Sequence, residues 1–109
     1  KKIKQYEAQA ATQEKSQQLK QAVMTLRAAV KIDPTRDDLK AKADEIKDEL
    51  RKQMMVFYQE GVLEESFGNV DGGDNRPGAK EKWKKIIEND LVDGEYYQKA
   101  FIKLKKYGD

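Results

Sequence analysis

The sequence contains no cysteine and no histidine, and it has only two prolines among its 109 residues. The absence of cysteine excludes disulfide bonds and thiolate chemistry. The absence of histidine removes the side chain that most often binds metals and most often transfers protons near neutral pH. Carboxylates are numerous, but none lies in an apolar sequence context that would set it apart as an acid or base. We therefore predict that the protein is not an enzyme and has no metal site and no cofactor.

The sequence also lacks a large excess of charge of either sign, and it lacks long apolar runs. The chain carries 22 lysines and arginines against 20 aspartates and glutamates, which leaves a net charge of +2. So small an excess does not predict nucleic-acid binding, and lysines that alternate with glutamates usually form the solvated faces of helices. No apolar run approaches the length of a membrane span. These absences favour a soluble, cytoplasmic protein without membrane insertion.

Length and composition predict one small helical domain. Hydrophobic residues make up 38% of the sequence and charged residues 39%. This balance is typical of helices with narrow apolar stripes and wide solvated faces, and the length suffices for one core. Because the chain begins with Lys1 rather than methionine, we expect the domain 1–109 to be a segment of a larger protein.

Apolar residues recur at intervals of three and four along most of the chain, which is the spacing of a buried helix face. The pattern predicts an all-α fold of about five helices with one unusually long central helix. The expected elements are a first hairpin over 2–32, a long helix over 36–67, a loop over 68–78, a helix over 79–89 and a terminal helix over 95–107.

The first hairpin is the part of this pattern that stays open. A polar stretch at 12–18 interrupts its apolar stripe, and a turn there would make Ser16 the N-cap of a second helix. No glycine or proline enforces the turn, so one unbroken helix up to Ile32 is the alternative. Asp33-Pro34 ends the element, because the residue before a proline is pushed out of helical geometry.

The core of the C-terminal part should form around two short helices. We expect the helix over 79–89 to bury Trp83, Ile86 and Ile87. We expect the terminal helix to bury Tyr97, Ala100, Phe101 and Leu104.

The loop before the first of these helices brings Asp71, Asp74 and Asn75 close together, which raises the question of a calcium site. An EF-hand loop needs glycine at its sixth position and glutamate at its twelfth. Counted from Asp71, these positions are Arg76 and Lys82. We therefore predict a solvated turn rather than a calcium loop.

Two stretches of the chain repeat one order of small, large and packing residues before a stop that contains aspartate. They are Ala22-x-x-x-Leu26-x-x-Ala29-Val30-x-Ile32-Asp33-Pro34 and Ala79-x-x-x-Trp83-x-x-Ile86-Ile87-x-Asn89-Asp90-Leu91. An internal repeat of this kind is typical of stacked helical hairpins, which usually hold partners rather than transform substrates.

The first of these stretches extends towards the N-terminus into a longer pattern of large residues, small residues and a proline. Its members are Tyr6, Ala10, Ala22, Leu26, Ala29 and Pro34. On these residues the chain resembles the tetratricopeptide repeat, a helix-turn-helix unit of about 34 residues. The second unit matches less closely, because Ile86 and Leu91 replace a small residue and the proline. The resemblance implies stacked antiparallel hairpins.

The resemblance also implies a binding groove, because repeats of this family bind peptides or helices on the face lined by the first helix of each hairpin. Carried over by position, the groove residues are Lys4, Glu7, Ala11 and Glu14 in the first unit and Met55, Tyr58, Val62 and Glu65 in the second. The chain would then be a non-catalytic scaffold for a protein or peptide partner.

An assembly module is the rival interpretation. Unbroken helices over 2–32 and 36–67 would form an antiparallel coiled-coil hairpin, and the long helix would pair with a second copy or with a neighbouring domain. The chain is also similar to repeat modules of bacterial multidomain signalling or secretion proteins, which would make it an oligomerisation part of such a complex.

Overall fold

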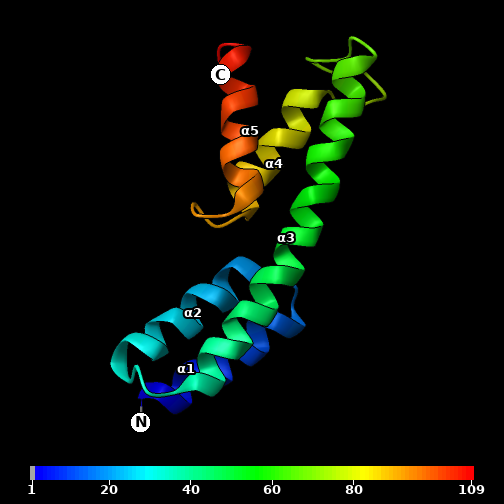
Figure 1. Ribbon diagram of the computed structural model, residues 1–109. Coiled ribbons are helices and arrows are strands. Elements are labelled where there is room, and N and C mark those ends of the chain that lie inside the picture. Colours follow the sequence, from blue (N-terminus) through cyan, green and yellow to red (C-terminus); the bar gives the residue numbers. More distant parts are fainter. Residues whose placement is uncertain (1) are drawn as a thin grey trace. The chain divides into compact units, whose positions relative to one another are not determined.

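The computed structural model describes residues 2–109, and within that range it contains five helices (Figure 1). They are α1 (Lys2–Lys15), α2 (Leu19–Ile32), α3 (Asp37–Ser66), α4 (Ala79–Asn89) and α5 (Glu95–Lys106). Consecutive helices make antiparallel contacts, and α3 is 30 residues long. β-Type pairing in residues 2–109 is limited to one isolated bridge between Gly73 and Arg76. The all-α prediction and the long central helix are confirmed.

The chain divides into two compact units, each with its own core. Unit 1 ends at Leu50 and unit 2 comprises Arg51–Asp109. Helix α3 contributes its first part to unit 1 and its second part to unit 2.

The core of unit 1 lies where α1, α2 and the first part of α3 meet. Ala22 and Ala29 are fully buried, so the helices approach closely at these positions. The Thr25 hydroxyl of α2 donates a hydrogen bond to the Gln13 side-chain oxygen of α1 over 2.7 Å. The buried apolar residues of the unit are Ala10, Leu19, Ala22, Val23, Leu26, Ala29, Leu39, Ala43, Ile46 and Leu50.

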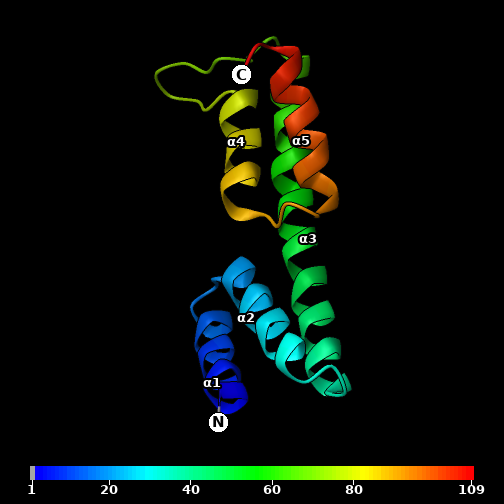
Figure 2. The same ribbon diagram turned by 90° about the vertical axis from the view of Figure 1, so that its left-hand side faces the viewer.

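A turn separates α1 from α2, which confirms the predicted break and excludes the unbroken helix over 2–32 (Figure 2). The Gln18 N–H donates to the Gln13 carbonyl and the Gln17 N–H donates to the Glu14 carbonyl, over 2.8 and 3.0 Å. These two bonds form a Schellman motif, a helix ending that usually places glycine in the left-handed conformation. Here Gln17 takes that place with a φ of 61°.

The predicted N-cap of α2 is wrong. Gln18 precedes the helix, and its side chain makes no capping hydrogen bond. Ser16 is still part of the ending of α1, because its N–H donates to the carbonyl of Thr12. With α1 and α2 separate, the coiled-coil hairpin of two unbroken helices is also wrong.

The ends of three further helices follow from local sequence, as expected. Asp33, directly before Pro34, is extended with φ −134° and ψ 91°, and it ends α2. Gly68 and Gly108 follow α3 and α5 with φ values of 79° and 83°, which glycine adopts without steric cost.

The core of unit 2 forms around Trp83, which is fully buried. Trp83 packs against the backbone of α3 at Gly61, where a side chain would overlap the indole ring. On another side the Tyr107 ring stacks on Trp83 with centroids 6.1 Å apart. The other fully buried side chains of this unit belong to Met54, Ala79, Ile86 and Ala100, whereas Ile87, which was also expected in the core, is half-buried.

One part of the predicted core of α5 is wrong. Phe101 is 46% exposed and Tyr97 is half-buried, whereas Tyr96 is buried together with Ala100 and Leu104. Apolar residues surround this helix on several sides, so the spacing alone fits more than one face. Contact with α3 and α4 selects the face of Tyr96.

We expect Gln17→Gly to stabilise unit 1 by about 0.5–1 kcal/mol, because glycine removes the steric cost of the left-handed conformation. Urea denaturation followed by circular dichroism measures the change. Gln18→Gly is the matched control and should be neutral or destabilising, since Gln18 has a φ of −90°. Equal effects of the two substitutions would contradict the assignment of strain to Gln17.

We expect Gly61→Ala to destabilise unit 2 by about 1–3 kcal/mol, because the added methyl group forces Trp83 out of its packing position. Trp83 is the single tryptophan, so its fluorescence during urea denaturation reports on this unit. Gly73→Ala serves as control, since a Cβ there would have no atom within 4 Å. If Gly61→Ala leaves the free energy of unfolding unchanged, α3 and α4 can move apart at this position with little loss of stability.

Candidate functional site

A small cleft opens in unit 1 beside α1. Its volume is about 150 Å³. Its lining residues are Glu7, Ala10, Ala11 and Glu14 of α1, Leu26 of α2, and Leu39, Lys42 and Ile46 of α3. We call this feature the unit 1 cleft. It brings together the predicted groove residues Glu7, Ala11 and Glu14, whereas Lys4 is not among the residues that line it.

The cleft exists because α1 presents two short side chains between two long ones. Residues three and four apart share one face of a helix, so Glu7, Ala10, Ala11 and Glu14 all face the same side. Ala10 is buried at the floor and Ala11 is exposed. The alanines leave space that a longer side chain would fill, and Leu26 gives the floor further apolar surface.

Ion pairs form the rim of the unit 1 cleft. Arg36 pairs with Glu7, and Lys42 lies 3.3 Å from the Glu14 carboxylate. Hydrogen bonds to Asp38, and then to Glu7, raise the pKa of Arg36, while the hydrogen bond to Glu14 raises the pKa of Lys42. Both cations therefore stay charged at neutral pH. The cleft thus combines an apolar floor with a charge-compensated rim.

The predicted groove residues of the second unit lie on α3 within unit 2, where α5 runs beside two of them. The rings of Tyr58 and Tyr96 are 5.6 Å apart, and the Lys99 ammonium lies 5.9 Å from the first ring and 5.0 Å from the second. Met55 is half-buried and Val62 is 37% exposed. Helix α5 of the same chain therefore covers the part of this face at Tyr58.

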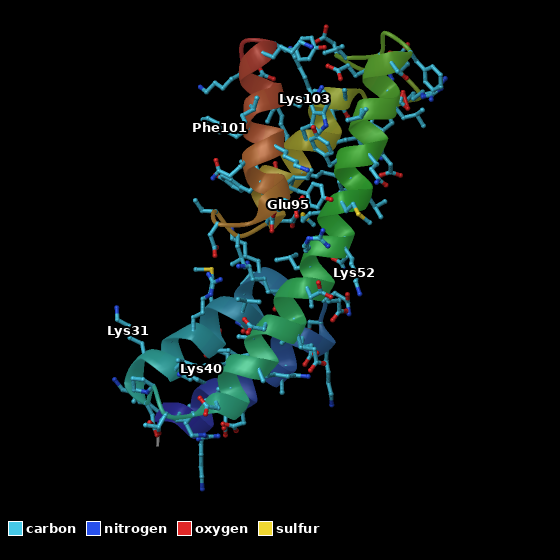
Figure 3. The ribbon with its side chains drawn as sticks, in the orientation of Figure 1. Lys31, Lys40, Lys52, Glu95, Phe101 and Lys103 are labelled. Atoms are coloured by element: carbon cyan, nitrogen blue, oxygen red, sulfur yellow. The ribbon has the colours of Figure 1, made fainter. Side chains whose placement is uncertain are left out.

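Glu65, the fourth residue of this set, is held by α5. Its carboxylate accepts hydrogen bonds from the Lys103 ammonium, over 2.8 Å, and from the Tyr107 hydroxyl. Figure 3 shows Lys103 on the side of α5 that faces α3. The bond from Lys103, followed by that from Tyr107, lowers the pKa of Glu65, and the same carboxylate raises the pKa of Tyr107. Glu65 therefore joins two helices within the unit.

The preceding residue, Glu64, is a structural residue that the sequence pattern did not predict. It is buried, and its carboxylate accepts hydrogen bonds from Asn69 and Arg76, both over 2.8 Å. These bonds lower the pKa of Glu64, with Asn69 making the larger contribution. Asn69 also donates to the Pro77 carbonyl, so Glu64 helps to hold the loop between α3 and α4. Glu64 lies in the last turn of α3 and Asn69 follows shortly after the helix end, so their closeness in the sequence could have indicated this hydrogen bond.

The loop between α3 and α4 carries Asp71, Asp74 and Asn75. No group of three or more acidic residues in the described part of the chain is placed to hold a metal ion. Lys80 lies 3.0 Å from the Asp71 carboxylate, which raises the pKa of Lys80.

Across residues 2–109, none of the helices is both long and apolar enough to span a membrane.

Comparison with protein-family models, with curated proteins and with solved structures found no match. The resemblance to tetratricopeptide repeats therefore stays a prediction from the sequence pattern. Any function must accordingly be inferred from the geometry of the unit 1 cleft and of the α3 face.

Glu65 should make the stability of unit 2 depend on pH. Because its pKa is lower in the folded chain than its ordinary value of 4.5, its contribution is complete above that pH and disappears as the pH falls through the lowered pKa. We expect Glu65→Gln to lower the free energy of unfolding at pH 7 and to reduce its loss between about pH 5 and pH 3. Urea denaturation followed by Trp83 fluorescence measures both effects.

Glu60→Gln provides the control for this experiment. Glu60 is 3.5 Å from Lys82 and its side chain is 47% exposed, so its removal should change stability little. If Glu65→Gln keeps the full pH dependence of the wild type, carboxylates other than Glu65 produce it.

Proposed function

We propose that the protein is a non-catalytic binding module that holds a peptide or helix of a partner protein at the unit 1 cleft. One observation carries the proposal: Glu7, Ala11 and Glu14, which the repeat resemblance assigned to a binding groove, lie around one open apolar cleft. Small apolar clefts with a few polar groups at the rim are the usual form of a binding site.

The size of the cleft suits one side chain of the partner. A cavity of about 150 Å³ accommodates a benzene-sized group. A leucine, methionine or phenylalanine could thus be buried against Ala10, Leu26 and Ile46. Most of the binding free energy at interfaces comes from a few such anchors rather than from the whole contact area.

The charged rim would determine how the bound segment is oriented, but it would not select segments by their net charge. Glu7 and Glu14 carry negative charge, whereas Arg36 and Lys42 carry positive charge beside them. A partner with both signs near its apolar anchor would be favoured, because each rim charge can then find an opposite one. A strongly acidic or basic segment would meet equal attraction and repulsion.

An assembly role that uses α3 is the second candidate, and an exposed stripe favours it. Val56 and Leu63 of α3 and Phe67 directly after it are 49%, 53% and 65% exposed, and their spacing places them near one face of the helix. Such a stripe would suit another helix. The exposed stripe therefore favours contact with another chain or domain, but it does not identify that chain or domain.

Ala11→Trp should abolish peptide binding, because the indole fills the unit 1 cleft. A display library of random peptides is selected on the wild-type protein, and the enriched peptides are titrated by fluorescence polarisation. We expect them to share one large apolar residue and to bind Ala11→Trp at least about tenfold more weakly.

Ala8→Trp is the matched control, since Ala8 lies on the same helix, is exposed and is not part of the cleft lining. It should bind the selected peptides as the wild type does. Selected peptides that bind Ala11→Trp unchanged would contradict the proposal, and so would a selection that enriches no binder.

A further inference from the structure

We propose that a groove between α4 and α5 binds the same groove of a second copy of this chain, which makes the protein a two-fold symmetric dimer. The groove has a volume of about 280 Å³, and Ile87 of α4 with Phe101 and Leu104 of α5 form its apolar part. We call it the α4–α5 groove. It belongs to unit 2 and does not include the residues of the unit 1 cleft.

Leu104 at the base of this groove belongs to the core of unit 2, whereas Phe101 at its exposed edge does not. Trp83, Ile86 and Ala100 fill that core and are fully buried. Phe101 and its neighbour Ile102 are instead 46% and 67% exposed, and Figure 3 shows Phe101 on the side of α5 that points away from α3. Exposed large side chains beside an apolar groove are typical of a surface that another protein covers.

The charges of the groove favour a second copy as the occupant. Lys84 is compensated within the chain, since its ammonium lies 3.3 Å from the Asp109 carboxylate. Glu88 of α4 forms no ion pair with any of residues 2–109, and Lys105 of α5 lies over the Phe101 ring at 5.3 Å without a carboxylate partner among those residues. One acid and one base without an ion-pair partner among residues 2–109 thus lie on opposite walls of one groove.

Such a pair of charges is complementary to itself. In a two-fold symmetric contact the same patch is used twice, so Glu88 of each copy can meet Lys105 of the other. Both charges are then compensated while the two Phe101 rings enter the facing grooves. A partner with charge of one sign would compensate one of them and repel the other.

The extent of the groove predicts a weak dimer. A stable interface covers about 800 Å² on each partner, and three apolar side chains with two ion pairs cover less than that. We therefore expect a dissociation constant on the order of 10–100 µM at low salt, which rises with ionic strength.

Analytical ultracentrifugation of the whole chain between about 5 µM and 1 mM tests the proposal. The wild type should change from monomer to dimer over this range. Phe101→Asp should weaken the dimer at least tenfold, because it places a carboxylate in the apolar contact. Circular dichroism and Trp83 fluorescence show whether each variant is folded.

A charge exchange makes the test specific for the two-fold arrangement. Glu88→Lys and Lys105→Glu should each weaken the dimer severalfold, because each leaves like charges facing one another. The double variant restores opposite charges and should dimerise within about threefold of the wild type. Leu63→Asp on the exposed stripe of α3 is the control and should dimerise normally.

Four results would overturn the proposal. A wild type that stays monomeric at the highest concentration leaves the groove to a different protein. A folded Phe101→Asp variant that dimerises normally, or a double charge variant no better than the single ones, removes the groove from the interface. Loss of the dimer in Leu63→Asp alone assigns assembly to α3 instead.

Discussion

Close approach of helices at very small side chains is the constraint on which both units depend. Ala22 and Ala29 are fully buried in unit 1, and Ala79 and Ala100 are fully buried in unit 2. With 38% hydrophobic residues, the chain has little apolar surface for a core, and short distances between helices use it fully. The space beside Gly61 shows the extreme case, because the indole of Trp83 occupies it.

Hydrogen bonds and ion pairs of two neighbouring carboxylates hold the loop after α3 and helix α5 in place beside the small apolar core of unit 2. The consecutive residues Glu64 and Glu65 point to different partners: Glu64 binds the loop after α3 through Asn69, and Glu65 binds α5 through Lys103. Their lowered pKa values have the same physical cause, since cations and hydrogen-bond donors stabilise the ionised forms. The end of α3 is therefore joined both to the following loop and to α5.

The two candidate surfaces differ in how their charges are compensated. At the unit 1 cleft, Glu7 and Glu14 already have cationic partners, so an apolar side chain can enter without leaving a charge unpaired. At the α4–α5 groove, Glu88 and Lys105 have no ion-pair partner among residues 2–109, and the proposed dimer would supply one to each. The first surface suits varied peptides and the second suits one defined geometry. A dimer would present two clefts, which strengthens binding to a partner with two segments.

The sequence by itself determined the helices and most of their ends. Proline after Asp33 and glycine at residue 68 act on the adjacent backbone alone, so their effects can be read locally. Likewise, the position of Glu7 and Ala11 on one helix face follows from their spacing. Only the tertiary structure decided that Tyr96 rather than Phe101 is buried and that α5 binds Glu65. Those outcomes depend on neighbours far away in the chain, and periodicity carries no information about them.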